Sequence, residues 1–121
     1  MAQFDFNEKF RNRTEKLSLQ VINWYGNLDP QDEETQLLGQ QLIHSITATA
    51  VGFRAACRAR SHAERLQKLG PVIEHSDQTL FWLDLFRQVK PGEHKTLDLI
   101  YAEALEILKV MSTHRRNLKT S

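Results

Sequence analysis

The sequence is poor in residues that cross-link a chain or anchor it in a membrane. Its one cysteine, Cys57, excludes a disulfide within the chain, which fits a reducing compartment. No apolar run approaches the roughly 18 residues that a membrane span needs. Residues 1–10 also lack the apolar segment of a secretion signal. We therefore expect a cytoplasmic protein without a membrane partner.

Helix-breaking residues are also scarce. Three prolines and five glycines occur in 121 residues, mostly between stretches that have helical periodicity. The length fits one domain over residues 1–121, and an apolar content of 40% is too high for a disordered chain. The formal net charge is +1, so net charge alone indicates no class of partner.

Four stretches repeat apolar or small residues at alternating steps of three and four, which is typical of helices packed in a bundle. Pro30 ends the first stretch, and the pattern from Ser61 to Glu64 is a capping box that begins the third. Pro71 lies inside the third stretch and predicts a kink rather than a break. The sequence predicts an all-α, up-down-up-down antiparallel four-helix bundle with helices at about residues 6–28, 32–60, 62–89 and 93–117.

The second stretch carries unusually small residues on its repeating positions. Ser45, Thr49, Gly52 and Ala56 continue the stripe that Leu42 belongs to. Small side chains let a neighbouring backbone approach closely, so the pattern predicts one tightly packed helix pair.

Charge is strongly segregated in such a bundle. Helices one and three begin where helices two and four end, and that half holds twelve of the sixteen Lys and Arg residues but four of the fifteen Asp and Glu residues. Helix dipoles favour cations only near helix C-termini, so they do not explain cations at the starts of helices one and three. This half is either an ordinary solvated surface or a site for a polyanion. The candidate nucleic-acid-binding residues are Lys9, Arg11, Arg13, Arg54, Arg58, Arg60, Arg65, Lys68, Arg115 and Arg116.

Patterns that carry catalytic or metal chemistry are missing from the sequence. No glutamate is followed three residues later by histidine, as di-metal bundles require, and the five histidines share no ligand-like spacing. Arg58 and His62 are too close in sequence for the Arg-to-His spacing of some helical ribonucleases. There is no glycine-rich phosphate loop. We therefore expect no metal, no cofactor and no enzymatic activity.

Aromatic residues fall on more than one face of the predicted helices. One face fills the monomer core, and a second face would be exposed unless another subunit covered it. The alternative is that all of these rings belong to the core. The candidate oligomer-interface residues are Phe53, Phe81, Trp82 and Phe86.

Several segments resemble a bacterial family of four-helix-bundle proteins named after 23S ribosomal RNA intervening sequences. The stretch from Phe53 to Ser61, with its Arg58-Ala59-Arg60-Ser61 turn, and the stretch from Asp77 to Leu85 carry the similarity. This family also includes accessory proteins of diversity-generating retroelements. The sequence departs from the family pattern at Ile43, Gly52, Ala55 and Gln78.

The resemblance implies a four-helix bundle that assembles as a homopentamer through its helix flanks. It also implies nucleic acid as a partner for the retroelement relatives, whereas most other members have no established activity. Two functions follow as alternatives. The first is a non-catalytic homo-oligomer that binds RNA or DNA through its basic end, and the second is a structural or adaptor oligomer that binds only protein.

Overall fold

The computed structural model describes residues 2–28 and 32–120, and its described residues fold into four long helices. The predicted all-α fold is therefore confirmed. The predicted stop at Pro30 lies outside the described residues. The helices are α1 Gln3–Gly26, α2 Glu33–Cys57, α3 His62–Val89 and α4 Lys95–Thr120.

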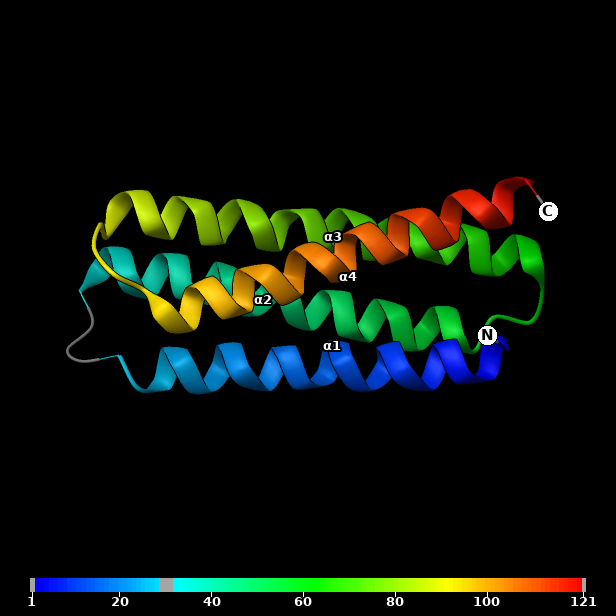
Figure 1. Ribbon diagram of the computed structural model, residues 1–121, viewed down its shortest axis with the longest axis horizontal. Helices are drawn as coiled ribbons and strands as arrows, with labels where there is room; N and C mark the ends of the chain where they lie inside the picture. Colours follow the sequence, from blue (N-terminus) through cyan, green and yellow to red (C-terminus); the bar gives the residue numbers. More distant parts are fainter. Residues whose placement is uncertain (1, 29–31, 121) are drawn as a thin grey trace.

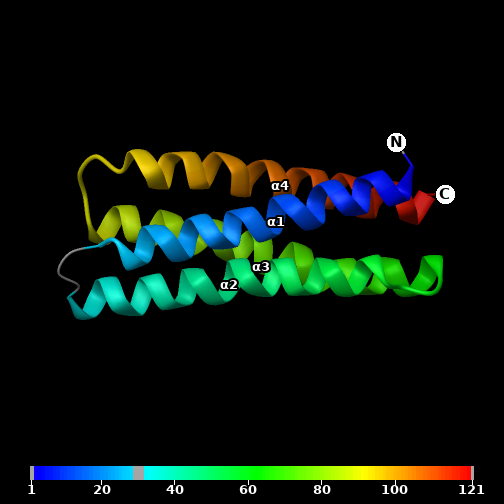
Figure 2. The same cartoon turned by 90° about the horizontal axis from the view of Figure 1, so that it is seen from below.

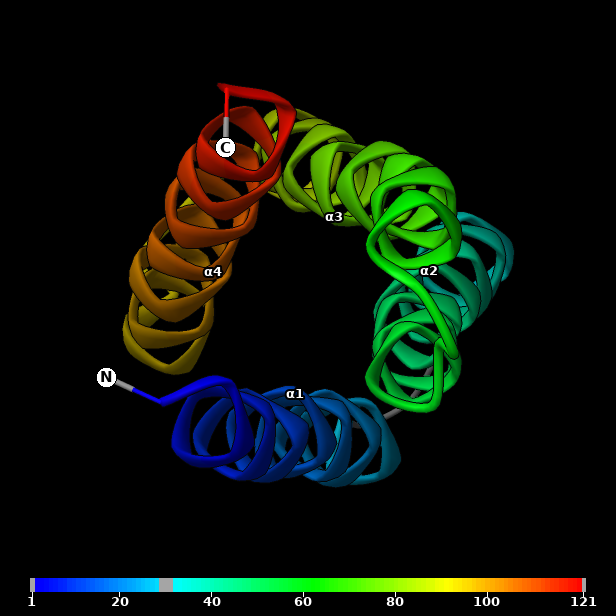
Figure 3. The same cartoon turned by 90° about the vertical axis from the view of Figure 1, so that its right-hand side faces the viewer.

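The helices run antiparallel to their neighbours in an up-down-up-down order. The start of α1, the end of α4 and the turn between α2 and α3 lie at one end of the bundle, and the end of α1, the start of α2 and the α3–α4 connection lie at the opposite end (Figures 1 and 2). Seen along its length, the bundle is a ring in the order α1, α2, α3, α4 (Figure 3). None of these four helices is apolar enough over its length to cross a membrane.

Capping explains where two of the helices begin. The Ser61 side chain accepts a hydrogen bond from the Glu64 backbone N–H at 3.1 Å, so the predicted N-cap of α3 is confirmed. Asp32 caps α2 in the same way, because its Oδ1 accepts from the Thr35 N–H at 2.8 Å. Helix α3 continues through Pro71 without a break.

The bounds of α3 agree with those predicted by periodicity, whereas both ends of α1, α2 and α4 differ by one to three residues. Helix α1 starts earlier, at Gln3, and Phe6 in its first turns packs on the core. Helix α2 stops at Cys57 instead of residue 60, since Ser61 needs extended backbone to cap the next helix. Helix α4 starts at Lys95, after Gly92 turns the chain with a φ of +132°.

The core takes its apolar side chains from all four helices. Leu17, Leu42, Leu83 and Ile107 are each almost completely buried, one on each helix. Hydroxyl groups also lie inside, and five of them donate to carbonyls of their own helices, while Thr79 also donates to Ser45 across two helices. The buried hydroxyl residues are Thr14, Ser18, Thr35, Ser45, Thr49, Ser76 and Thr79.

The tightly packed helix pair is α2 with α3. A Cβ added to Gly52 would lie 3.1 Å from Val72 Cγ2, and Thr79 Oγ1 donates to Ser45 Oγ at 3.0 Å across the pair. Helices α1 and α4 pack least closely of the four neighbouring pairs. The small residues of α2 therefore allow α2 and α3 to pack more closely than the other neighbouring helices do.

Gly39 of α2 is another position where a glycine permits close packing, and it yields a stability prediction. The Tyr25 ring of α1 lies directly over Gly39, so the methyl group of Gly39→Ala would overlap this ring. We expect a loss of about 1 kcal/mol or more, although alanine favours the helix, because overpacking outweighs that gain. Urea unfolding would measure the change.

The Tyr25→Ala background tests the stated cause. There the methyl group has space, so Gly39→Ala should raise the free energy of unfolding by roughly 0.5–1 kcal/mol. A loss of the same size in both backgrounds would show that the Tyr25 ring is not the reason.

Candidate nucleic-acid interface

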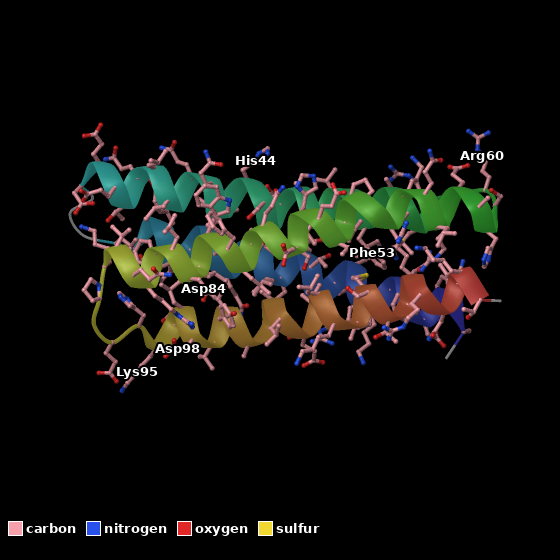
Figure 4. All side chains as sticks on the ribbon, turned by 90° about the horizontal axis from the view of Figure 1, so that it is seen from above. His44, Phe53, Arg60, Asp84, Lys95 and Asp98 are labelled. Carbon is pink, nitrogen blue, oxygen red and sulfur yellow. The ribbon has the colours of Figure 1, made fainter. Side chains whose placement is uncertain are left out.

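Eleven of the twelve predicted cations, together with Lys109 of α4, gather in the half of the bundle that holds the start of α1, the end of α4 and the α2–α3 turn, which we call the basic end. Lys16 is the exception, because it lies past the middle of α1, level with the first turns of α4. Arg60 marks this end in Figure 4, whereas Lys95 and Asp98 mark the opposite end. The contributing residues are Lys9, Arg11 and Arg13 of α1, Arg54 of α2, Arg58 and Arg60 of the turn, Arg65 and Lys68 of α3, and Lys109, Arg115, Arg116 and Lys119 of α4.

Cations at the opposite end are neutralised by neighbouring carboxylates. Three of the four basic residues outside the basic end form ion pairs, namely Arg87, Lys90 and Lys95. Arg87 Nη2 lies 2.7 Å from Asp98 Oδ1. Lys90 pairs with Asp32, and this hydrogen bond holds the pKa of the Asp32 carboxyl well below its usual range.

The basic end lacks comparable pairing. Among residues 2–28 and 32–120, Arg13 is the one cation of the twelve that has a carboxylate within ion-pair distance. The two ends therefore differ in charge compensation as well as in charge number. A surface of uncompensated cations attracts polyanions more strongly than one of the same composition with internal ion pairs.

Most of the candidate cations can reach solvent. Arg11 and Arg115 are half-buried, and Arg115 Nε donates to the Leu66 carbonyl at 3.4 Å. Arg11 and Arg54 border a shallow groove of about 280 Å³ between α1 and α2. The exposed candidates are Lys9, Arg54, Arg58, Arg60, Lys68 and Arg116.

Arg13 does not fit the expected role. Its Nε and Nη2 donate to the two carboxylate oxygens of Glu103 on α4 at 2.9 and 2.6 Å, and Nη2 also lies 3.1 Å from Glu106 Oε1. Its guanidinium carbon lies 4.9 Å from the centroid of the Phe10 ring. The two glutamates neutralise Arg13, so we assign it to the joining of α1 and α4 instead of to phosphate binding.

Arg65 is a second correction, because its side chain lies inside the bundle. It is 3% exposed, and no carboxylate among the described residues lies within ion-pair distance. Its Nη1 donates to the carbonyl of Ala56 at 3.4 Å, near the C-terminus of α2, where the helix dipole is negative. Burial removes Arg65 from any surface that a nucleic acid could touch.

The remaining hydrogen bonds of Arg65 fix the state of His114. Arg65 Nε and Nη2 lie 3.2 and 2.9 Å from His114 Nε2, so this nitrogen accepts and the imidazole is neutral. Burial, assisted by the positive charge of Arg65, lowers the pKa of His114 to about 4. The Phe6 ring stacks on the imidazole with ring centroids 4.2 Å apart.

The four aromatic interface candidates divide into core and surface. Phe53 is fully buried and Phe86 is 3% exposed, so neither ring can reach a second subunit, and this expectation is corrected (Figure 4 shows Phe53 between the helices). Phe81 is 55% exposed, and Trp82 is half-buried with its ring 5.0 Å from that of Phe81. Only the rings of Phe81 and Trp82 remain accessible.

The sequence analysis missed an opening between α1 and α4. A cleft of about 500 Å³ lies there, and Lys16 borders it together with a polar stripe that continues to Gln20, Asn23 and Asn27. These four residues are spaced 4-3-4, so the sequence already indicated that they share one polar face of the helix, next to the apolar face.

Comparisons with known proteins establish the fold. No protein-family model and no curated protein matches the sequence. A solved structure of a protein of unknown function from the S23 ribosomal protein family of Bacteroides thetaiotaomicron is similar, with a TM-score of 0.74 and 19% sequence identity. The match covers 87% of this chain and 96% of that one, so the two share the fold over nearly their whole length.

The Arg65–His114 contact predicts a specific dependence of stability on pH. In the unfolded chain His114 should titrate near its ordinary pKa of about 6.5. Its folded pKa is about 4, so the unfolded state binds more protons between these values and stability is lost as the pH falls from 6.5 towards 4. We expect a loss of about 1–2 kcal/mol, discounted because the ring is half-exposed.

His114→Gln is the matched variant, because its amide oxygen can still accept from Arg65 but does not titrate. Urea unfolding of both proteins at pH 7 and pH 4.5 would measure the difference. The variant should lose less stability than the native protein over this interval. If both lose the same amount, His114 is not the group responsible.

Proposed function

We propose that this protein is a non-catalytic, cytoplasmic homo-oligomer that binds RNA or DNA through its basic end. The observation that carries this proposal is the contrast in ion pairing between the two ends of the bundle. Arg87, Lys90 and Lys95 are each neutralised by a neighbour, whereas exposed cations such as Arg54 and Arg58 have no carboxylate partner among the described residues.

Protein surfaces commonly neutralise a local excess of like charge, because crowded cations repel one another and destabilise the folded state. This basic end leaves its excess uncompensated around the α2–α3 turn, the start of α1 and the end of α4. Binding a phosphate backbone would relieve the repulsion and release condensed counterions, which is the main source of affinity in non-specific nucleic-acid binding. Arg11, Arg54 and Arg58 extend this surface along α1 and α2.

The resemblance to the 23S ribosomal RNA intervening-sequence proteins agrees with this proposal. The function of the similar Bacteroides protein is unknown, so this protein supports the fold but gives no information about a ligand. We propose membership of that family and, with it, a homopentamer. Basic ends that lie side by side around one rim would add their fields and favour a long polyanion over a small one.

Removing exposed cations should weaken nucleic-acid binding. We expect the dissociation constant for a mixed-sequence, 20-nucleotide RNA to rise about tenfold or more at low salt, because phosphate contacts are lost. Each lost contact should also reduce the slope of log affinity against log salt concentration by about 0.7. Fluorescence anisotropy over a salt series would measure both quantities. The quadruple variant is Arg11→Gln, Arg54→Gln, Arg58→Gln and Arg116→Gln.

A second quadruple variant changes the net charge equally at the opposite end. It should bind with nearly native affinity if the basic end is the site. Circular dichroism would establish that both proteins are folded. Equal weakening by both variants would mean that only total charge matters, and no binding by the native protein would end the proposal. The control substitutions are Lys16→Gln, Arg87→Gln, Lys90→Gln and Lys95→Gln.

An adaptor that binds only protein is the second candidate function. It is favoured by an apolar patch on the outer side of α3, where Phe81 and Val89 are 55% and 41% exposed. Phe81, Leu85 and Val89 follow each other at steps of four residues and so share one helix face, with Trp82 beside them. A patch of this kind is typical of a surface that another chain covers.

Phe81→Ser tests whether this patch mediates self-association. The variant should shift light-scattering mass towards the 14.1 kDa of one chain, while the free energy of unfolding of the separated chain changes by less than about 1 kcal/mol. Phe4→Ser is the control, because Phe4 is 70% exposed but lies at the start of α1. A native protein that is monomeric at micromolar concentration would contradict self-association.

A further inference from the structure

The cleft between α1 and α4 has the form of a small-molecule site that is separate from the exposed cations of the basic end. Its volume is about 500 Å³, within the range of sites for small organic ligands. Its accessible apolar lining comes from Leu99, which is 74% exposed, and from Trp24 and Leu28, which are half-buried. The surface inside the cleft is therefore apolar and partly aromatic.

The border of the cleft is polar and comes from both helices. Gln20, Asn23 and Asn27 line it from α1, and Thr96 lines it from α4. These amide and hydroxyl groups can donate as well as accept hydrogen bonds. An apolar interior with a few polar groups at its edge is typical of pockets that orient an amphiphilic ligand.

Rigid contacts limit the cleft on two sides. The paired hydrogen bonds between Arg13 and Glu103 tie α1 to α4 next to it. The Trp24 ring is held edge-on against Phe86, with ring centroids 5.0 Å apart. The cleft is therefore shaped before a ligand arrives, which lowers the entropy cost of binding.

Among the described residues that line the cleft, Lys16 is the cation that forms no ion pair at close range, although the hydrogen bond from Arg13 and the charge of Lys16 both help to lower the pKa of Glu103, which also lines the cleft. Glu103 and Glu106 neutralise Arg13, whereas Lys16 has no carboxylate within ion-pair distance among the described residues. Lys16 is exposed at the border, so its ammonium can reach a group held at the mouth of the cleft. Its flexible stem suits a monodentate contact with an anionic oxygen.

We propose that the α1–α4 cleft binds a small amphiphilic anion, with a flat apolar body against Trp24, Leu28 and Leu99 and a carboxylate or sulfonate at Lys16. The amide groups of Gln20 and Asn23 would orient the polar end of such a ligand. This site does not depend on nucleic-acid binding, because none of the exposed arginines of the basic end lines it.

The dye 1-anilinonaphthalene-8-sulfonate is a suitable probe, since it joins a flat apolar body to one sulfonate. Fluorescence titration of the full chain at neutral pH should show saturable binding of one dye per chain. Lys16→Gln should weaken this binding about tenfold, the loss of one charge-assisted hydrogen bond. The uncharged dye N-phenyl-1-naphthylamine should bind Lys16→Gln and the native protein within about twofold.

Two further variants separate the cleft from other surfaces. Lys68→Gln removes an exposed lysine of α3 that does not line the cleft, and it should leave both dyes unaffected. Asn23→Trp should fill the cleft and reduce the binding of both dyes, with circular dichroism establishing that the helices persist. Because Lys16→Gln and Lys68→Gln are surface changes, the test does not depend on Asn23→Trp folding.

Three results would overturn the proposal. The first is no saturable binding of either dye, and the second is equal loss of sulfonate-dye binding in Lys16→Gln and Lys68→Gln. The third is dye binding that appears only when an oligomer, followed by light scattering, dissociates, because the cleft would then be covered by a second copy. None of these results bears on RNA binding, which the arginine variants test separately.

Discussion

The close packing of α2 on α3 is the constraint on which the rest of the bundle depends. Gly52 brings the α2 backbone so near to Val72 that an added Cβ would lie 3.1 Å away, and the Thr79–Ser45 hydrogen bond crosses the same pair. A ring of four helices around one core cannot be equally tight on every side when one pair is this close. The opposite pair, α1 with α4, packs least closely and keeps a cleft between its helices.

Between α1 and α4, where apolar packing is least close, polar side chains form contacts between the helices. Arg13 bridges α1 to Glu103 and Glu106 of α4, and the ion pair is half-buried, so its hydrogen bonds are stronger than those of an exposed pair. Arg65 has the corresponding place inside the basic end, with His114 and the Ala56 carbonyl as partners. Arg13 and Arg65 were both expected to be surface cations, but each connects two helices.

These links refine the interpretation of the basic end. Without Arg13 and Arg65, the surface that a polyanion could touch consists of exposed cations on α1, α2, the α2–α3 turn, α3 and α4. The opposite end shows that the chain can neutralise its cations where structure requires it, as Lys90 does with Asp32. Apart from Arg13, the described cations of the basic end have no carboxylate close enough to form an ion pair. The four-helix geometry alone does not explain this, since the opposite end has the same geometry and forms ion pairs.

The sequence by itself determined the four helices, their order, the α3 cap at Ser61 and the separation of charge, because periodicity and capping are local and a short connection forces antiparallel neighbours. Only the tertiary structure decided which side chains of one type are buried. Arg65 and Arg58 are the same residue type, but Arg65 is buried and Arg58 is exposed. In the same way, Phe53 is buried in the core and Phe81 is exposed. That choice depends on the rotation of each helix and on its distance from its neighbours, which follow from packing over the whole bundle.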